Sequence, residues 1–255
     1  MELPRSSSLV ARLDVVPHAG STNTELVRAA AEDPGAWPAP AVLVTDHQTA
    51  GRGRLGRSWT ARPGDSLAIS VLLRPAVPAE CLGWLSLAAG AAMTQALEGL
   101  GVAARAKWPN DVLIGDRKVC GVLGEALVDG GVVIGAGLNH GAPRDALPVP
   151  TATSLAAEGG PTDPDLLVAA YLERLLALVA AFEGAGGDPE ASGVRAAVLA
   201  ASGTVGRRVR VDAAGGPVVG TAVDIDAAGR VVVDRGPTGG RTACATGDVE
   251  HLRYE

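Results

Sequence analysis

The sequence predicts an α+β protein in which helices flank a mixed, largely antiparallel sheet, with a small β-barrel at the C-terminal end. Three observations lead to this fold class. Helix and strand patterns intermix over residues 9–99, short strands with tight turns fill residues 103–140, and strand patterns dominate after Gly203. With 255 residues, 47% of them apolar, the chain can bury a core in one or two domains. We expect a larger domain over residues 1–202 and a smaller one over residues 203–255.

The first part of the chain is expected to contain three strands, at residues 9–16, 41–45 and 66–73. A helix should open within residues 21–25 and end near residue 33. Thr22 and Glu25 have the spacing of a capping box, in which a hydroxyl and a carboxylate satisfy free backbone N–H groups. Residues 46–65 form a long loop, and a loop of that length inside a compact domain is usually functional or mobile.

Further helices are predicted by helical spacing and by capping residues. Apolar side chains recur at helical spacing over residues 78–99, where Gly99 can end the helix. Asp163 can cap another helix with Pro164 at its first position, and a last helix is expected near residues 189–201. The strands of the small barrel are expected at residues 207–212, 218–225, 229–234 and 241–246.

The charge balance argues against a protein held to nucleic acid by phosphate neutralisation, which normally requires a basic surplus. The chain has 22 basic and 28 acidic residues, a net charge of −6. No apolar run reaches the roughly 18 residues of a membrane span, and the N-terminus lacks the pattern of a signal peptide. We therefore expect no DNA partner, no membrane partner and a cytoplasmic location. The cysteines, which have no metal-ligand spacing and are expected to be reduced, are Cys81, Cys120 and Cys244.

Lysine is scarce in this chain, which otherwise uses arginine for positive charge. Lys107 and Lys118 are the only lysines among 22 basic residues. A compact ammonium differs chemically from a planar guanidinium, so a lysine retained against this habit points to a functional site. The alternative is that rare residues, these lysines among them, occur where they do by chance or to suit turns.

A glycine-arginine segment at residues 51–57 is the first candidate site. It matches G-x-G-x-x-G but runs into Ser58, Trp59 and Thr60 without opening a helix, so the dinucleotide-binding interpretation fails. Glycines allow a ligand to approach the backbone, and the arginines supply bidentate donors for phosphate or carboxylate. We interpret the segment as an anion site. The alternatives are a solvated basic turn or a nucleic-acid-binding arm.

Both lysines lie in the second candidate, around a predicted hairpin. Lys107 is followed by Asn110 and Asp111 at a turn, and Lys118 lies on the far side of the next turn. Asp111 could bind magnesium together with substrate phosphates. An ordinary Asn-Asp turn with exposed lysines is the alternative.

Two weaker candidates are made of small or neutral residues. The side chains of residues 21–23, Ser-Thr-Asn, could bind a neutral hydrogen-bonding group such as a urea or an amide, although a helix cap explains Thr22 equally well. Residues 135–139, Gly-Ala-Gly-Leu-Asn, suggest a close backbone approach to a ligand, with a tight strand crossing as the alternative.

In this order, the four segments resemble the biotin protein ligases, which attach biotin to the carrier domains of acyl-CoA carboxylases. Residues 46–59 are similar to the family's glycine-arginine loop, and residues 107–111 and 116–123 to its second signature. The resemblance covers about residues 9–255. It implies a catalytic domain like that of class II aminoacyl-tRNA synthetases, a C-terminal SH3-like barrel, and biotin, ATP and Mg²⁺ as the molecules that are bound.

The resemblance also implies residue roles. Arg54 and Lys118 would be catalytic, and Asp111 would bind Mg²⁺. Biotin would contact Ser21, Thr22, Asn23, Gln48, Gly51, Arg52, Gly53, Arg54 and Lys118. ATP would contact Arg52, Arg54, Trp59, Lys107, Asn110, Lys118 and Asn139. The reaction would form biotinyl-5′-AMP and pass biotin to a carrier lysine, and a homodimer is compatible with the family.

Some features depart from the family pattern. Leu55 stands where many members carry another arginine, so retention of the adenylate could differ. Only twenty residues precede Ser21, so we expect the form without an N-terminal DNA-binding domain. Two other functions stay open: a lipoate or octanoate ligase or transferase of related architecture, for which Cys120 is the nearest candidate nucleophile, and a non-catalytic nucleic-acid-binding module.

Overall fold

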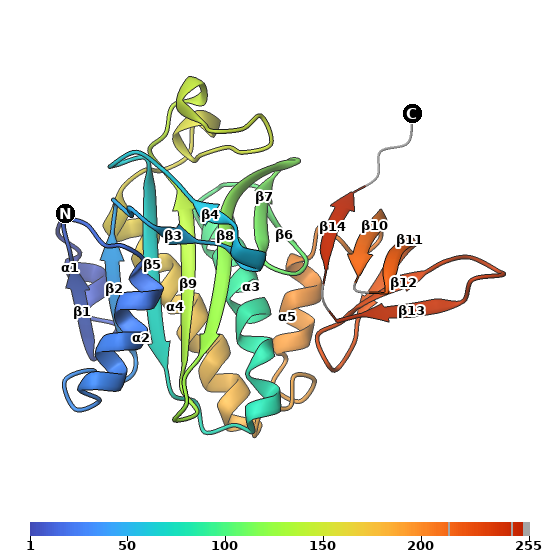
Figure 1. Ribbon diagram of the computed structural model, residues 1–255, viewed down its shortest axis with the longest axis horizontal. Helices are drawn as coiled ribbons and strands as arrows, with labels where there is room; N and C mark the ends of the chain where they lie inside the picture. Colours follow the sequence, from blue (N-terminus) through green and yellow to red (C-terminus); the bar gives the residue numbers. More distant parts are fainter. Residues whose placement is uncertain (214, 246, 252–255) are drawn as a thin grey trace.

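Two β-sheets organise the chain in the computed structural model, which describes residues 1–213, 215–245 and 247–251 (Figure 1). The larger sheet has seven strands in the order β1-β2-β5-β9-β8-β7-β6. Only β1 and β2 run parallel, and every other neighbouring pair is antiparallel. The predicted α+β class with a mixed, largely antiparallel sheet is confirmed. The strands are β1 (Arg12–Val15), β2 (Ala41–Thr45), β5 (Ser66–Leu73), β6 (Ala104–Lys107), β7 (Asp111–Ile114), β8 (Arg117–Ala126) and β9 (Val132–Asn139).

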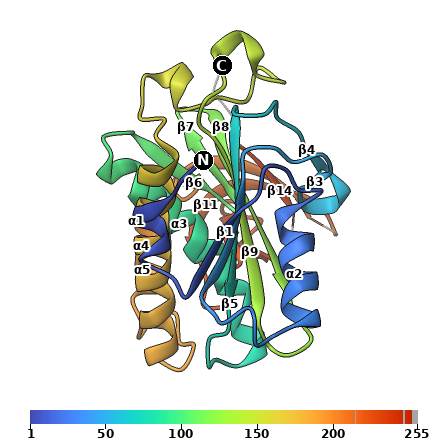
Figure 2. The same ribbon diagram turned by 90° about the vertical axis from the view of Figure 1, so that its left-hand side faces the viewer.

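Helices cover the two faces of this sheet unequally (Figure 2). One face is covered by α3, with α4 and α5 packed against it and α1 against α4, while α2 lies alone on the opposite face. In α2, Leu26 and Ala30 are fully buried against strand residues that include Leu72 and Val133. Among the described residues α2 is the one helix on that face, which leaves the rest of the face for a site. The helices are α1 (Pro4–Ser7), α2 (Thr22–Glu32), α3 (Gly83–Gly99), α4 (Pro164–Gly184) and α5 (Val194–Ala201).

The predicted capping box at the start of α2 is wrong. Thr22 is already the first helical residue, and Ser21, the residue before it, makes no capping hydrogen bond with its side chain. The Thr22 hydroxyl instead donates to Gln48 Oε1 at 3.2 Å. Glu25 accepts a hydrogen bond from the backbone N–H of Gly20 at 2.6 Å. The Thr22 side chain is therefore turned away from its own helix and is used in a tertiary contact.

The other helices begin near the residues predicted from the sequence, with local differences. Asp163 caps α4 by accepting from the N–H groups of Asp165 and Leu166, as predicted. The helix expected over residues 78–99 begins with a short 3₁₀ turn, Ala79–Cys81, before α3. The helix expected from residue 189 begins only at Val194, because tight turns occupy residues 188–193.

The long loop of residues 46–65 folds into a short hairpin of β3 (Gly51–Arg52) and β4 (Ser58–Trp59). A 3₁₀ turn, Arg54–Gly56, joins these strands. Leu55 in this turn has φ 55° and ψ 35°, a left-handed conformation that costs a non-glycine residue about 1–2 kcal/mol. Its side chain is 75% exposed.

The smaller sheet is antiparallel and barrel-like, with the order β13-β12-β11-β10-β14. The first four strands match predicted ones, whereas β14 was not predicted. The strand expected over residues 241–246 ends at Cys244, and Thr246 lies outside the described residues. The strands are β10 (Arg208–Ala213), β11 (Gly216–Ile225), β12 (Val231–Asp234), β13 (Arg241–Cys244) and β14 (Asp248–His251).

Two tryptophans attach the smaller sheet to the rest of the chain. Trp84 in α3 donates its indole N–H to the carbonyl of Ala227 at 2.9 Å, and Trp108 donates to that of Gly229 at 3.0 Å. Both carbonyls belong to the turn between β11 and β12. Arg195 in α5 adds a hydrogen bond to the carbonyl of Ile225. In the part of the chain that the structure describes, no helix has the length and apolar character needed to cross a bilayer.

Candidate active site

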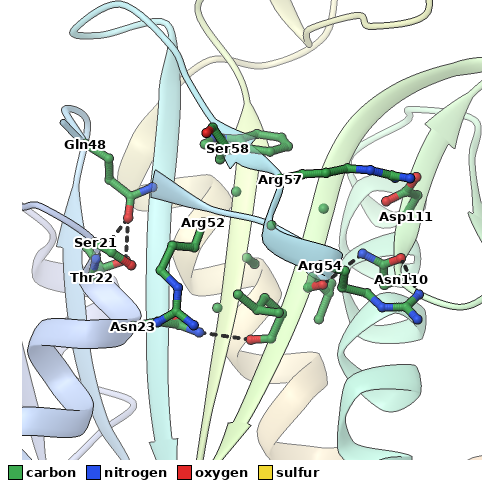
Figure 3. A pocket seen from close by; sticks show the side chains of 18 of the residues that line it. Ser21, Thr22, Asn23, Gln48, Arg52, Arg54, Arg57, Ser58, Asn110 and Asp111 are labelled. Atoms are coloured by element: carbon green, nitrogen blue, oxygen red, sulfur yellow. Dashed lines mark hydrogen bonds between the residues drawn. The ribbon is translucent and has the colours of Figure 1, made fainter. Parts of the chain in front are cut away.

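The site is a cavity on the same face of the larger sheet as α2, where β8 and β9 meet under residues 46–59, the glycine-arginine loop (Figure 3). Its floor has no side chains at three positions: Gly121 and Gly137 face each other in register, and Gly135 follows along β9. A Cβ atom on Gly137 would lie 2.6 Å from the Trp59 ring, and one on Gly135 would lie 2.8 Å from Asn23 Cγ. Residues 135–139 were predicted to allow a close approach of a ligand; at Gly135 and Gly137 the side chains of Asn23 and Trp59 make the close approach.

One end of the cavity is neutral and rich in hydrogen-bonding groups. Gln48 Oε1 accepts from the Thr22 backbone N–H at 2.9 Å and from its hydroxyl. Ser70 Oγ lies 2.8 Å from Thr22 Oγ1 and 2.6 Å from Asn23 Oδ1. Ser21, Thr22 and Asn23 are all more than 90% buried. This pre-arranged set of hydroxyls and amides suits a neutral ligand with both donors and acceptors.

The other end of the cavity is cationic. Arg54 reaches across from the loop and donates to Asn110 Oδ1 at 3.1 Å (Figure 3). The Asn110 amide in turn donates to the carbonyl of Val122 at 3.0 Å. The Asn110 amide thereby holds the Arg54 guanidinium against the sheet. The other N–H groups of this guanidinium can bind an anion.

Lys118 lies between an acid and an aromatic ring. Its ammonium is 2.7 Å from Asp111 Oδ1 and 5.4 Å from the centroid of the Trp59 ring. The Trp59 indole N–H donates to Ser66 Oγ at 3.3 Å. Both lysine and aspartate are partly exposed, so an incoming anion can compete for the ammonium.

Two further arginines of the loop are paired at the edges of the cavity. Arg52 lies 3.0 Å from Glu125 and donates to the Thr24 hydroxyl at 3.0 Å. Arg57 forms an ion pair with Asp248 of β14. The smaller sheet therefore contributes a carboxylate to the cavity, which is lined by four cations and two carboxylates: Arg52, Arg54, Arg57, Lys118, Asp111 and Asp248.

Most of the residues singled out from the sequence lie together in this cavity. They are Ser21, Thr22, Asn23, Gln48, Arg52, Gly53, Arg54, Trp59, Asn110, Asp111 and Lys118. Gly51 lines a neighbouring hollow of the loop, and a Cβ atom added to it would lie 2.8 Å from Gln48 Nε2. Asn139 lines a neighbouring cavity and donates to the carbonyl of Thr153. Lys107 lines a separate hollow against α3 and α5.

Comparison with known proteins identifies the family. Residues 18–139 match the biotin/lipoate A/B protein ligase family, and residues 204–252 match the biotin protein ligase C terminal domain. The chain is 42% identical over 252 residues to the biotin--[acetyl-CoA-carboxylase] ligase of Mycobacterium tuberculosis, covering 95% of this chain and 90% of that one. The chain belongs to the biotin protein ligase family.

A second relative and a solved structure agree with this membership. The biotin--[acetyl-CoA-carboxylase] ligase of Paracoccus denitrificans is 40% identical over 168 residues, 59% of this chain and 68% of that one. The biotin protein ligase of Aquifex aeolicus, solved in complex with biotin and ATP, superimposes with a TM-score of 0.76 at 25% identity. That match covers 96% of this chain and all of the other.

Several residues that line or support the cavity were not singled out from the sequence. Arg57 belongs to the predicted anion site of residues 51–57, whereas Ser58 had no predicted role. Gly121 and Asp248 gave no separate signal, because only the pairing of β8 with β9 and the docking of β14 bring them to the site. Ser70 does not line the cavity but contacts Thr22 and Asn23; it is a buried hydroxyl within an apolar strand, and that pattern could have marked it.

Few of the described side chains at the site could bind a magnesium ion. Among the described residues, no group of three or more His, Cys, Asp or Glu side chains could bind a metal ion. Asp111 offers one carboxylate, already paired with Lys118. Magnesium commonly binds through one or two carboxylates together with substrate phosphates, so Asp111 fits an ion that arrives with ATP.

Cys120, the cysteine nearest to a candidate segment, is unsuited to nucleophilic catalysis. All three cysteines are free, and Cys120 and Cys244 are buried. Burial raises the pKa of the Cys120 thiol to about 12, outweighing the nearby Lys118 charge, which lowers it. Because the thiolate is the reactive form, an acyl-enzyme on Cys120 is disfavoured.

Proposed function

We propose that this biotin ligase activates biotin with ATP to biotinyl-5′-AMP and then transfers the biotinyl group to a lysine of a carrier protein. The observation that carries the proposal is the division of one cavity into a neutral hydrogen-bonding end and a cationic end. Biotin has the same division, with a ureido ring at one end and a carboxylate at the other. The named relatives, biotin--[acetyl-CoA-carboxylase] ligases, support this substrate.

The neutral end would bind the ureido ring through Ser21, Thr22, Asn23 and Gln48. The backbone at Gly51 and Gly53 would lie close to the bound biotin, since glycines permit that approach. Arg54 and Lys118 would receive the carboxylate and the phosphate, while Arg52, held beside Asn23 by Glu125 and the Thr24 hydroxyl, would contact biotin at the neutral end. The reacting carboxylate would then lie at the cationic end of the cavity.

The first step joins two anions that repel each other. A carboxylate oxygen of biotin attacks the α-phosphorus of ATP, a P–O bond breaks, and pyrophosphate leaves. Fixed cations lower the repulsion and hold the reactants in contact, which is the main source of catalysis in such transfers. Arg54 and Lys118 are the catalytic residues that we propose for this step, and Lys118 would exchange its Asp111 partner for substrate oxygens.

The second step needs no covalent enzyme intermediate. A neutral amine of the carrier lysine attacks the acyl carbon of the mixed anhydride, the C–O bond to phosphate breaks, and AMP leaves with the electron pair. The nitrogen then loses a proton to give the amide. The glycine-arginine loop would exclude water, which would otherwise hydrolyse the anhydride.

ATP would occupy the cationic end and the neighbouring cavity. Trp59, Lys107, Asn110 and Asn139 are the further contacts that we propose, although Lys107 would have to act from outside the main cavity. Mg²⁺ would be bound by Asp111 and the phosphates, where it would neutralise charge on the departing pyrophosphate.

The remaining expectations are also proposals. The acceptor would be the biotin carboxyl carrier domain of an acyl-CoA carboxylase, and the protein would act in the cytoplasm without a DNA or membrane partner. Sedimentation would test whether two copies pair into a homodimer. The division into a catalytic domain at residues 1–202 and a barrel domain at residues 203–255 stays a prediction. Limited proteolysis near residue 203 would test it.

A lipoate or octanoate ligase or transferase is the weaker candidate. The match of residues 204–252 to the biotin protein ligase C terminal domain and the relatives' names favour biotin. An acyl-enzyme transferase would also need a reactive thiol, which the burial of Cys120 disfavours.

Biotin-dependent exchange of labelled pyrophosphate into ATP tests the proposed function directly. The native protein should exchange with biotin, and Lys118→Ala and Arg54→Ala should lower exchange by at least about a hundredfold, as is usual when a transition-state contact is lost. Exchange with octanoate or lipoate but not with biotin would refute the proposal in favour of its rival.

A further inference from the structure

Glu125 lies outside the cavity but contacts two of the residues that line it. It is the ninth residue of β8, two positions beyond Leu123, the last residue of that strand on the cavity wall. Its side chain is 22% exposed. Glu125 Oε2 accepts from Asn23 Nδ2 at 2.9 Å, and Glu125 Oε1 lies 3.0 Å from Arg52 Nη2. One carboxylate therefore joins α2 to the glycine-arginine loop.

The contact with Glu125 fixes the orientation of the Asn23 amide. Asn23 Nδ2 donates to Glu125 and, at 3.1 Å, to the carbonyl of Leu123, which uses both of its hydrogens. On the other side, Ser70 Oγ is 2.6 Å from Asn23 Oδ1. An amide has two nearly isosteric orientations, and these three contacts select the one that leaves a lone pair of Oδ1 for a ligand donor.

The contact with Arg52 fixes one end of the loop. The Arg52 side chain is 52% exposed, so a single ion pair with it would contribute little. Here, however, Glu125 and the Thr24 hydroxyl bind two different nitrogens of the guanidinium at 3.0 Å each. These two contacts direct the Arg52 side chain to the neutral end of the cavity, beside Asn23 (Figure 3).

We propose that Glu125 is a positioning residue for biotin, acting through Asn23 and Arg52. It sets the amide that accepts from the ureido ring and holds the arginine beside it, so that both are in place before biotin arrives. This inference rests on the proposed function, because it assumes that the neutral end binds the ureido ring. Pre-arranged contacts raise affinity mainly by removing the cost of ordering the site.

A glutamine at this position separates positioning from packing. Glu125→Gln has the same shape but only one acceptor oxygen, so it can serve Asn23 or Arg52 but not both. We expect biotin affinity, measured by isothermal titration calorimetry without ATP, to fall about tenfold, the effect of losing one charge-assisted hydrogen bond. The KM for ATP should change less than about threefold, and the unfolding midpoint by only a few degrees.

Glu98→Gln is the matched control, because it also removes a carboxylate paired with one arginine, Arg105, but at an exposed site. It should bind biotin like the native protein. Failure of the native protein to bind biotin would refute the proposed function. Native binding with an unchanged affinity in Glu125→Gln, or an equal loss for biotin and ATP, would instead overturn the positioning role alone.

A double-mutant cycle tests whether Glu125 acts through Asn23. Asn23→Ala removes the amide that Glu125 orients, so adding Glu125→Gln should weaken biotin binding by clearly less than the tenfold seen alone. Residues in one hydrogen-bond network couple in this way. Fully additive losses would mean that Glu125 affects biotin by a route other than Asn23 and would overturn the mechanism.

Discussion

Gly135→Ala should weaken biotin binding by displacing Asn23 from the cavity floor. The backbone at Gly135 does not require a glycine for its conformation, since its φ is not in the left-handed region. The added Cβ would lie 2.8 Å from Asn23 Cγ, and Oδ1 would be closer still. Ordinary contact begins near 3.4 Å, so the amide must move by about 0.6 Å or more (3.4 − 2.8).

The size of the effect follows from the contacts of the Asn23 amide. Its hydrogen bonds to Ser70, Leu123 and Glu125 measure 2.6, 3.1 and 2.9 Å, and a shift of that size lengthens or breaks them. The ligand would lose one or two hydrogen bonds, worth about 1–3 kcal/mol in total. Biotin affinity should therefore fall about tenfold to a hundredfold, while overpacking would lower the free energy of unfolding by about 1–3 kcal/mol.

Calorimetric titration of biotin, with thermal unfolding measured in parallel, tests this reasoning. Gly124→Ala is the matched control, because its added Cβ would lie 2.5 Å from Ser86 Oγ of α3, on the face away from the cavity. The control should affect stability without loss of biotin affinity. If Gly135→Ala bound biotin as tightly as the native protein, the position of Asn23 would be irrelevant to binding and the argument would be refuted.

Three other predictions concern single side chains. Lys118→Arg should fail to restore the pyrophosphate exchange that Lys118→Ala loses, because a guanidinium is too broad for the position between Asp111 and Trp59. Both variants should unfold near the native midpoint. Near-native exchange in the arginine variant would contradict this prediction. Cys120→Ala should keep exchange within about threefold, because the buried thiol is not a nucleophile, and loss of activity with the fold intact would count against it. Burial, with a contribution from Lys107, lowers the pKa of His251 from 6.5 to about 4, so below pH 6.5 the unfolded chain takes up a proton that the folded chain does not. Stability should therefore fall as the pH falls from 6.5 toward 4, and urea unfolding of His251→Gln should show a flatter dependence on pH; an unchanged slope would refute the assignment.

The fold was predictable where sequence periodicity and turn residues agree. The strands over residues 41–45 and 66–73 are apolar runs, and Asp163 with Pro164 marks the start of α4. The start of α2 was not predictable in detail, because Thr22 has the residue type and spacing of a cap but is engaged by Gln48 from a distant loop. Local rules cannot anticipate a tertiary contact that uses the same hydroxyl.

The candidate site was predictable from unusual residue types, and less so from ordinary ones. Scarce lysine marked Lys118, and the glycine-arginine pattern marked Arg52 and Arg54. Glu125 and Asp248 are common surface residue types, and they acquire a place at the site only through strand pairing and the packing of the smaller sheet. Their positions needed the three-dimensional arrangement.

The two indole hydrogen bonds that receive the β11–β12 turn have a mechanical consequence. Trp108 lies two residues before Asn110, whose amide oxygen accepts from Arg54. The same short segment therefore binds both Arg54 and the β11–β12 turn of the smaller sheet. A rocking motion of that sheet would pull on the anion-binding end of the cavity. Weakening either indole hydrogen bond should therefore change the affinity for ATP, although neither tryptophan lines the cavity.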